Sequence, residues 1–277
     1  MTAAAEDRSL KGAVDVLRRN NVTVSGNPSG PVVMFAHGFG CSQETWNLVA
    51  PRFEADHCVV VFDHVGSGRS DWSMYDRGKY SALDGYARDV EEILATLEAE
   101  DVVFVGHSVS AMIGVLAADL NPGRYRGLVL VSPSPRYIND DGYVGGFEPA
   151  DIDALLDSLD ANYLGWSRQT APMIMGTPER PMLEERLTDG FCSVDPEIAR
   201  HFARVTFTSD NRRDLESVRV PTLVLQCRED AIAPMDVGRY VHAAIPGSRF
   251  EILETTGHVP ILSAPDDVAL HLRRFLS

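Results

Sequence analysis

A serine occupies a tight corner in the segment FVGHSVSAMIG, which runs from residue 104 to residue 114. Ser108 lies at its centre, between Gly106 and Ser110; an apolar run at 102–105 precedes it and an apolar helical pattern follows. A serine between a buried strand and a helix needs small residues two positions to either side, because larger side chains would clash at so sharp a turn. The segment therefore predicts a nucleophile elbow with Ser108 as the nucleophile. The usual motif ends in glycine, and we expect Ser110 to replace it simply because it is also small.

A serine hydroxyl is a poor nucleophile at neutral pH and needs a histidine base oriented by a carboxylate. After a nucleophile elbow, these residues follow the serine in the order acid, then histidine. His258 is the candidate base, because it follows the last expected strand in the segment ETTGHVP. Asp230 is the candidate acid, because it ends the strand LVLQCRED and leads into a turn, whereas its neighbour Glu229 is expected to be solvated. The other possible acid position, at the end of the run 126–134, offers Ser132 and Ser134 but no carboxylate before Asp140.

The other histidines and one further aspartate have different expected places. His107 is next to the nucleophile, so its side chain should point elsewhere and shape the pocket floor or pack. His37 belongs to the turn HGFG and should support the geometry of that loop. Asp63 also ends a strand but precedes Ser108, which breaks the chain order, so we expect it to brace the loop HVGSGRSD. The remaining histidines are interpreted as surface or packing residues: His57, His64, His201, His242 and His271.

Acyl transfer also needs hydrogen-bond donors aimed at the oxyanion of the tetrahedral intermediate. One expected donor is the backbone N–H of Val109, directly after the nucleophile, at a helix N-terminus that favours negative charge. The other is the backbone N–H of Phe39, in the loop after the apolar run PVVMFAHG. Gly38 and Gly40 allow that loop to approach a substrate closely. The Phe39 ring would then form a wall of the pocket.

Short apolar runs alternate with helical patterns along the first half of the chain. The segment 83–99, for example, carries apolar residues on one face with the period of an α-helix. Continuous apolar strands that alternate with amphipathic helices are typical of a parallel sheet covered on both faces. The expected strands lie at 31–38, 57–66, 101–108, 126–134, 221–227 and 248–254. The sequence thus predicts an α/β fold with a mostly parallel sheet flanked by helices.

This alternation stops between residues 135 and 208. Helical segments without a convincing buried strand are expected there at 149–165, 167–176, 179–190 and 196–208. Prolines 149, 178, 181 and 196 stand near the expected helix starts, where a missing N–H costs least. We therefore predict an α/β core made of residues 1–134 and 209–277, interrupted by an all-helical insert at 135–208.

The charge balance argues against nucleic acid and membrane surfaces as partners. The 277 residues include 25 Lys and Arg against 40 Asp and Glu, a formal net charge of -15. Such a chain repels phosphate backbones and anionic lipid headgroups. No apolar run reaches the roughly 18–20 residues that span a bilayer. The N-terminal segment MTAAAEDRSLKG lacks the apolar core of a secretory signal, so we expect a cytoplasmic protein.

The four cysteines stand at positions 41, 58, 192 and 227. None forms a Cys-x-x-Cys pair and none neighbours a histidine at metal-ligand spacing, so buried thiols in a reducing compartment are expected. The glycine-rich stretch GSGRS lacks the lysine and the helix spacing of a phosphate-binding loop. The sequence therefore predicts neither a metal site nor a cofactor.

Several segments resemble the RsbQ-like α/β-hydrolases, a family that includes a bacterial energy-stress regulator and the plant strigolactone and karrikin receptors. The segments include HGFGCSQETWNLVAP, DHVGSGRSD, FVGHSVSAMIG, SPRYINDDGYVGGFE, VPTLVLQC and GHVPILSAPDDV, and the resemblance covers nearly the whole chain from about Arg19. It implies an α/β-hydrolase fold in which the insert is a four-helix, V-shaped cap over an apolar pocket. It also implies the catalytic triad Ser108, Asp230 and His258, with Phe39 and Val109 as oxyanion donors.

By the same resemblance, Trp166 and Phe207 of the insert join Phe39 and His107 around the pocket. Two functions of different kinds follow. One is a serine hydrolase that cleaves small, neutral, hydrophobic carboxylic esters or lactones through an acyl-enzyme. The other is a ligand-sensing module with slow hydrolysis, which acts with a regulatory protein partner at the cap. A third alternative keeps the triad but uses it for carbon–carbon bond hydrolysis or cofactor-free perhydrolysis.

Overall fold

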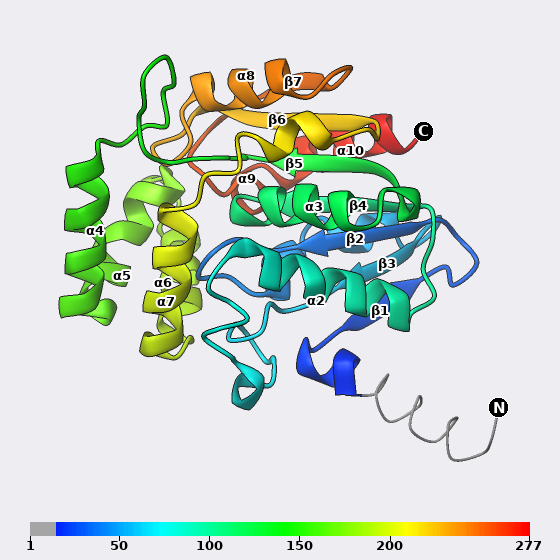
Figure 1. Ribbon diagram of the computed structural model, residues 1–277, viewed down its shortest axis with the longest axis horizontal. Coiled ribbons are helices and arrows are strands. Elements are labelled where there is room, and N and C mark those ends of the chain that lie inside the picture. Colours follow the sequence, from blue (N-terminus) through cyan, green and yellow to red (C-terminus); the bar gives the residue numbers. More distant parts are fainter. Residues whose placement is uncertain (1–14) are drawn as a thin grey trace.

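The computed structural model describes residues 15–277. In this part of the chain seven strands form one sheet, in the order β1-β3-β2-β4-β5-β6-β7 (Figure 1). The strands are β1 (Thr23–Gly26), β2 (Val32–Ala36), β3 (Cys58–Val61), β4 (Val102–His107), β5 (Tyr125–Val131), β6 (Thr222–Glu229) and β7 (Arg249–Thr256). β1 pairs antiparallel with β3, and all the other neighbours are parallel. The predicted α/β fold with a mostly parallel sheet is therefore confirmed.

Helices cover both faces of the sheet. Alternate residues of a strand point to opposite faces, so a strand of consecutive apolar residues packs against helices on both sides. In β2, Val33 and Phe35 join one apolar cluster, whereas Met34 and Ala36 join the other. The second cluster includes residues of α2 (Leu83–Thr96), α3 (Val109–Leu120) and α8 (Met235–Ala244). The first includes residues of α9 (Pro260–Ser263), α10 (Pro265–Leu276) and the 3-10 helices η1 (Gln43–Trp46) and η2 (Ala50–Phe53). Further 3-10 turns are η3 (Trp72–Met74), η4 (Pro122–Arg124) and η5 (Asp214–Ser217).

Four helices lie between β5 and β6 in the chain: α4 (Pro149–Ala161), α5 (Tyr163–Met175), α6 (Pro181–Cys192) and α7 (Pro196–Phe207). They stand together beyond one end of the sheet, in green to yellow in Figure 1. Each of α4, α6 and α7 begins at a proline, as the sequence suggests. We keep the division into a core and a cap at 135–208 as a proposal.

Two helix boundaries in this region differ from the prediction. The segment expected at 149–165 breaks at Asn162, which leaves the helix with φ −155°. Its side chain accepts a hydrogen bond from the Gly165 N–H at 3.0 Å and so caps α5, which begins earlier than expected. Pro178 lies in the turn before α6, and Pro181 is the first residue of that helix.

Candidate active site

The turn between β4 and α3 holds Ser108 in a strained backbone conformation, with φ 57° and ψ −124°. Non-glycine residues rarely adopt a positive φ, and such strain is typical of functional sites. Gly106 permits the turn, because a Cβ atom there would lie 2.3 Å from the carbonyl oxygen of Ser110. The Ser108 N–H donates to the Val131 carbonyl of β5 at 2.8 Å. These contacts hold the Ser108 hydroxyl at the carboxyl ends of the central strands.

Ser108, His258 and Asp230 form one continuous chain of hydrogen bonds. His258 Nε2 lies 2.7 Å from Ser108 Oγ, and His258 Nδ1 lies 2.8 Å from Asp230 Oδ2. The other carboxylate oxygen, Asp230 Oδ1, accepts from the backbone N–H groups of Ile232 at 2.8 Å and Ala233 at 3.0 Å. Because a carboxylate only accepts, the imidazole proton lies on Nδ1 and Nε2 is free to take the serine proton. The arrangement can activate a serine hydroxyl as a nucleophile.

The three residues meet because parallel strands end at the same edge of the sheet. Ser108 follows β4, Asp230 follows β6, and His258 follows β7. Glu229, the alternative acid, has an exposed side chain that accepts from Thr256 Oγ1 at 3.3 Å and does not reach the imidazole. The chain order that suggested Asp230 therefore agrees with its position next to His258.

The loop that carries His258 is in direct contact with α5. The His258 N–H donates to the Ile174 carbonyl at 2.8 Å, and the Gly257 N–H donates to the Glu229 carbonyl at 2.8 Å. Gly257 has φ +98°, and a Cβ atom there would lie 1.9 Å from the Met175 carbonyl oxygen. Only glycine fits this contact, so the C-terminal end of α5 and the His258 loop are fixed against each other.

The expected oxyanion donors have the required surroundings. Val109 is the first residue of α3, so its backbone N–H has no acceptor within the helix. The Gly38 carbonyl accepts from His37 Nδ1 at 2.8 Å and from the Cys41 N–H at 3.2 Å. In a trans peptide the N–H points away from the carbonyl, so the Phe39 N–H is directed away from these two donors. Neither N–H group has a hydrogen-bond acceptor among residues 15–277.

A small, mostly apolar cavity of about 30 Å³ borders the Ser108 hydroxyl. This volume holds about two water molecules. The residues around it include the four pocket residues expected from the sequence, Phe39, His107, Trp166 and Phe207, and also Cys41, Tyr137, Ile174, Leu187, Phe191, Thr206, Ile232 and Val259. A wider hollow on the surface near Gln43 does not reach Ser108.

The Phe39 ring is the centre of an aromatic cluster around this cavity. Its centroid lies 6.2 Å from that of Trp166, 5.8 Å from Phe191, 5.7 Å from Phe202 and 6.1 Å from Phe207. Rings at these separations and inclinations attract one another beyond the burial of their area. The loop after β2 and the helices α5, α6 and α7 therefore close the cavity together.

His107 supports the triad rather than joining it. Its Nε2 donates to the His258 carbonyl at 2.8 Å, which places the proton on Nε2 and leaves Nδ1 without a partner among the described residues. Burial, with a smaller effect from nearby His258, lowers the pKa of His107 to about 3. His107 is therefore neutral at physiological pH and fixes the backbone of the candidate base.

The structure adds to the expectation for two residues near the elbow. Ser110 is more than a small residue, because its hydroxyl donates to the His37 carbonyl at 2.5 Å and lies 2.7 Å from His64 Nε2. Of the two places expected for His64, surface or packing, the structure shows packing: it is fully buried, and its backbone N–H donates to His37 Nε2 at 3.1 Å. Three polar residues thus connect the carboxyl ends of β2 and β3 with the start of α3.

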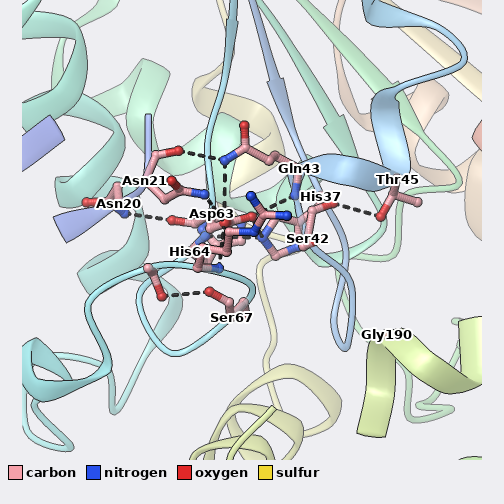
Figure 2. A network of polar contacts seen from close by, with 12 residues as sticks. Asn20, Asn21, His37, Ser42, Gln43, Thr45, Asp63, His64, Ser67 and Gly190 are labelled. Carbon is pink, nitrogen blue, oxygen red and sulfur yellow. Dashed lines mark hydrogen bonds and ion pairs between the residues drawn. The ribbon is translucent and has the colours of Figure 1, made fainter. Parts of the chain in front are cut away.

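Asp63 braces its loop as expected, and a second loop as well (Figure 2). Its carboxylate is only 1% exposed and accepts from the Arg69 N–H at 2.9 Å, within the predicted loop. It also accepts from the Gln43 N–H at 2.7 Å and from Asn21 Nδ2 at 2.7 Å. The negative charge is therefore buried among N–H donors, and it connects the loop after β3 to the loop that carries Phe39.

Three further expectations concern cysteines, metals and membranes. Cys41, Cys58, Cys192 and Cys227 are all free thiols. Among residues 15–277 no group of three or more histidine, cysteine, aspartate or glutamate side chains is placed to hold a metal ion. In the same part of the chain, no helix combines the length and the apolar character needed to cross a bilayer.

The sheet, the strained serine turn and the hydrogen-bonded serine, histidine and aspartate define the class. The chain belongs to the alpha/beta hydrolase family, whose family model matches residues 33–270. It is 38% identical over 258 residues to karrikin insensitive 2 receptor CA of Petunia hybrida, covering 93% of this chain and 95% of that protein. It is 37% identical over 264 residues to strigolactone esterase D14 of Arabidopsis thaliana, covering 95% of this chain and 98% of that protein.

A solved structure is also similar to this chain. A hydrolase from Oleispira antarctica matches with a TM-score of 0.92 and 39% identity, covering 95% of this chain and 96% of that one. The kinship with the RsbQ-like family of strigolactone and karrikin receptors, which the motifs suggested, is thereby confirmed.

Proposed function

We propose that this protein is a serine hydrolase that cleaves small, neutral, hydrophobic carboxylic esters or lactones. One observation carries the proposal: the hydrogen-bond chain from Asp230 through His258 to Ser108 ends at a cavity lined mostly by apolar side chains. The chain supplies a nucleophile and a base, and the apolar lining favours neutral acyl groups. The names of the relatives, which include an esterase, support the same reaction class.

In the proposed reaction, Ser108 Oγ attacks the ester carbonyl carbon while its proton passes to His258 Nε2. The carbonyl oxygen becomes an oxyanion, which the N–H groups of Phe39 and Val109 stabilise, and Asp230 stabilises the imidazolium. The intermediate collapses, the alcohol leaves with the proton from His258, and Ser108 carries the acyl group. Water then attacks the acyl-enzyme by the same route and releases the acid. With a lactone, the alcohol and the acid leave as one hydroxy acid.

The test is hydrolysis of a panel of p-nitrophenyl esters and small lactones by the wild type and by Ser108→Ala. The wild type should hydrolyse members of the panel, and Ser108→Ala should lose at least ~10³-fold in kcat. Ser132→Ala is the matched control, because Ser132 is also buried, follows the neighbouring strand β5 and has a positive φ of 48°. Phenylmethylsulfonyl fluoride should add to Ser108 alone, as read by peptide mass mapping. An adduct on Ser110 or Ser132 would contradict the assignment.

A second candidate function is ligand sensing, in which the proposed cap at 135–208 responds to the ligand and engages a regulatory protein. The hydrogen bond between the His258 N–H and the Ile174 carbonyl favours it, because it links the catalytic loop to α5. A relative named as a receptor supports it further. A ligand shifts such an equilibrium only if it binds the two cap arrangements with different affinity.

Hydrogen exchange across residues 135–208 separates the two functions. It is measured on Ser108→Ala with and without a lactone that the wild type hydrolyses slowly. Sensing requires altered protection in this segment when the lactone binds. Unchanged protection, together with turnover by the wild type of about 1–10³ s⁻¹, would exclude sensing and favour the serine hydrolase.

A cytoplasmic location is also part of the proposal. The free thiols at positions 41, 58, 192 and 227 support it, since unpaired cysteines are usual in a reducing compartment. Fractionation of cells that express the protein is the test, and recovery outside the cytoplasmic fraction would contradict it.

A further inference from the structure

A closed set of hydrogen bonds joins Ser110, His37 and His64 directly behind the candidate oxyanion donors. Ser110 Oγ donates to the His37 carbonyl at 2.5 Å. His64 Nε2 lies 2.7 Å from Ser110 Oγ, and the His64 N–H donates to His37 Nε2 at 3.1 Å. All three side chains are fully buried. Buried polar groups of this kind stabilise one arrangement only when every partner is present.

The acceptors in this set fix the position of each proton. A carbonyl oxygen only accepts, so the Ser110 hydroxyl proton points to the His37 carbonyl. His64 Nε2 therefore carries a proton and donates it to Ser110 Oγ. His64 Nδ1 is then unprotonated, and it has no partner among the described residues. Burial, followed by the effect of His37, lowers the pKa of His64 well below its usual value, so the ring is neutral.

The same reasoning applies to the His37 ring. The His37 Nε2 atom accepts from the backbone N–H of His64, so it carries no proton. The Asp63 Oδ1 atom lies 4.0 Å from His37 Nε2, which is too far for it to accept a hydrogen bond from that nitrogen. Its proton is on Nδ1, which donates to the Gly38 carbonyl at 2.8 Å. Burial lowers the pKa of His37, which agrees with a neutral ring. Two consecutive carbonyls are thus held: that of His37 by Ser110, and that of Gly38 by the His37 ring.

These bonds determine where the Phe39 N–H points. The Gly38 carbonyl and the Phe39 N–H belong to one planar trans peptide, so fixing the carbonyl fixes the N–H on the opposite side. The far end of the same loop is held by Asp63, which accepts from the Gln43 N–H at 2.7 Å (Figure 2). The loop is therefore anchored before and after Phe39, and Ser110 is its direct link to the helix that follows the nucleophile.

We propose that Ser110 is a positioning residue: its hydroxyl holds the His37 carbonyl and so steadies the residue whose ring fixes the Gly38 carbonyl, which orients the Phe39 N–H toward the oxyanion. This inference rests on the proposed serine hydrolase function. A glycine at position 110, as in the usual elbow motif, would fit the turn equally well but would leave the His37 carbonyl and His64 Nε2–H without their partner. The hydroxyl, and not only the small size, is what this position requires.

The experiment compares Ser110→Ala and Ser110→Gly with the wild type. Ser167→Ala is the matched control: Ser167 is also fully buried, and its hydroxyl donates to a backbone carbonyl, that of Tyr163, at 2.8 Å, within α5. The first measurement is kcat and KM for p-nitrophenyl butyrate. The second is inhibition by phenylboronic acid, in which Ser108 Oγ adds to boron, its proton passes to His258, and boron keeps both hydroxyls.

Both Ser110 variants should lose about tenfold in kcat with KM unchanged, less than the roughly 10²–10³-fold lost when an oxyanion donor itself is removed. The inhibition constant of phenylboronic acid should rise by about the same factor, because its tetrahedral adduct places an oxygen in the oxyanion site. Ser167→Ala should match the wild type in both measurements. A melting temperature for each variant accompanies the kinetics.

Two results would overturn this inference and leave the proposed hydrolase function untouched. Wild-type values in Ser110→Ala and Ser110→Gly would mean that only a small residue is needed. An equal loss of kcat in Ser167→Ala would mean that any lost buried hydroxyl has this effect. A wild type that neither hydrolyses esters nor binds phenylboronic acid would instead refute the proposed function, and the inference with it.

Discussion

Acidification should destabilise the fold through His107, which is buried and neutral beside the triad. Its pKa is lowered to about 3 by burial, from the ordinary value of 6.5. The unfolded chain therefore binds a proton at this imidazole below pH 6.5, whereas the folded protein does not until about pH 3. Because the unfolded state binds more protons in this window, the free energy of unfolding falls as the pH falls.

The magnitude follows from the width of the window. Lowering the pH from 6.5, the ordinary value, to 5 covers 1.5 pH units. At 1.36 kcal/mol per unit, the contribution of His107 is a loss of about 2 kcal/mol. A typical domain has a free energy of unfolding of only ~5–15 kcal/mol, so this loss is large enough to measure.

Comparison of the wild type with His107→Gln isolates this contribution. The glutamine does not titrate, whereas the buried His37 and His64 are present in both proteins and their contributions cancel. Urea unfolding at pH 7.5 and pH 5, followed by tryptophan fluorescence, gives the four free energies of unfolding. The wild type should lose about 2 kcal/mol more than His107→Gln between the two pH values. An equal loss in both proteins would refute the reasoning, as would an NMR titration of the His107 ring with a midpoint above pH 5.

Three further predictions concern the site and its contacts. Phe207→Asn should lower kcat/KM for p-nitrophenyl butyrate relative to acetate by about tenfold, because two buried CH₂ groups contribute about 1.6 kcal/mol. Equal losses on both esters would place this ring outside the acyl site. Gly257→Ala should lower both the melting temperature and kcat, because the new Cβ meets α5; Gly142→Ala, which also has a positive φ but open space around it, should keep kcat. Asp230→Asn should lower kcat by about 10⁴-fold by favouring the wrong imidazole tautomer, whereas Glu229→Gln should not. Loss of activity in the Glu229 variant would reverse the choice of acid.

The central strands could be predicted from the sequence because they are buried on both faces and read as continuous apolar runs. The run at 102–105 became β4 (Val102–His107), and the run at 221–227 became β6 (Thr222–Glu229). β1 (Thr23–Gly26) was missed, because its sequence TVSG is short and largely exposed at the edge of the sheet. Such a strand is defined by its antiparallel pairing with β3, which leaves no apolar pattern to detect.

The candidate site also contains residues that could be predicted from the sequence and residues that could not. Ser108 and its neighbours form a local pattern, and chain order then leaves few candidates for the base and the acid. Pocket residues such as Tyr137 and Phe191 have no such local signature, because they reach the cavity from different elements only after the chain has folded. The hydroxyl of Ser110 was missed for the same reason: its partners, His37 and His64, are distant in the sequence.

The size of the cavity connects the two proposed functions. Because the space of about 30 Å³ next to Ser108 is small, even an ester such as p-nitrophenyl butyrate needs some surrounding side chains to move, and a larger ligand needs a larger displacement. The Phe191 ring of α6 packs so closely over Gly40 that a Cβ atom there would lie 1.8 Å from it. α5 is bonded to the His258 loop through Ile174. We therefore expect that displacing these helices disturbs the two loops that carry the proposed oxyanion donor and the proposed base, and so slows the hydrolysis of a large ligand. Small esters that leave the helices in place are the substrates to test for turnover, and larger lactones are the ligands to test for sensing.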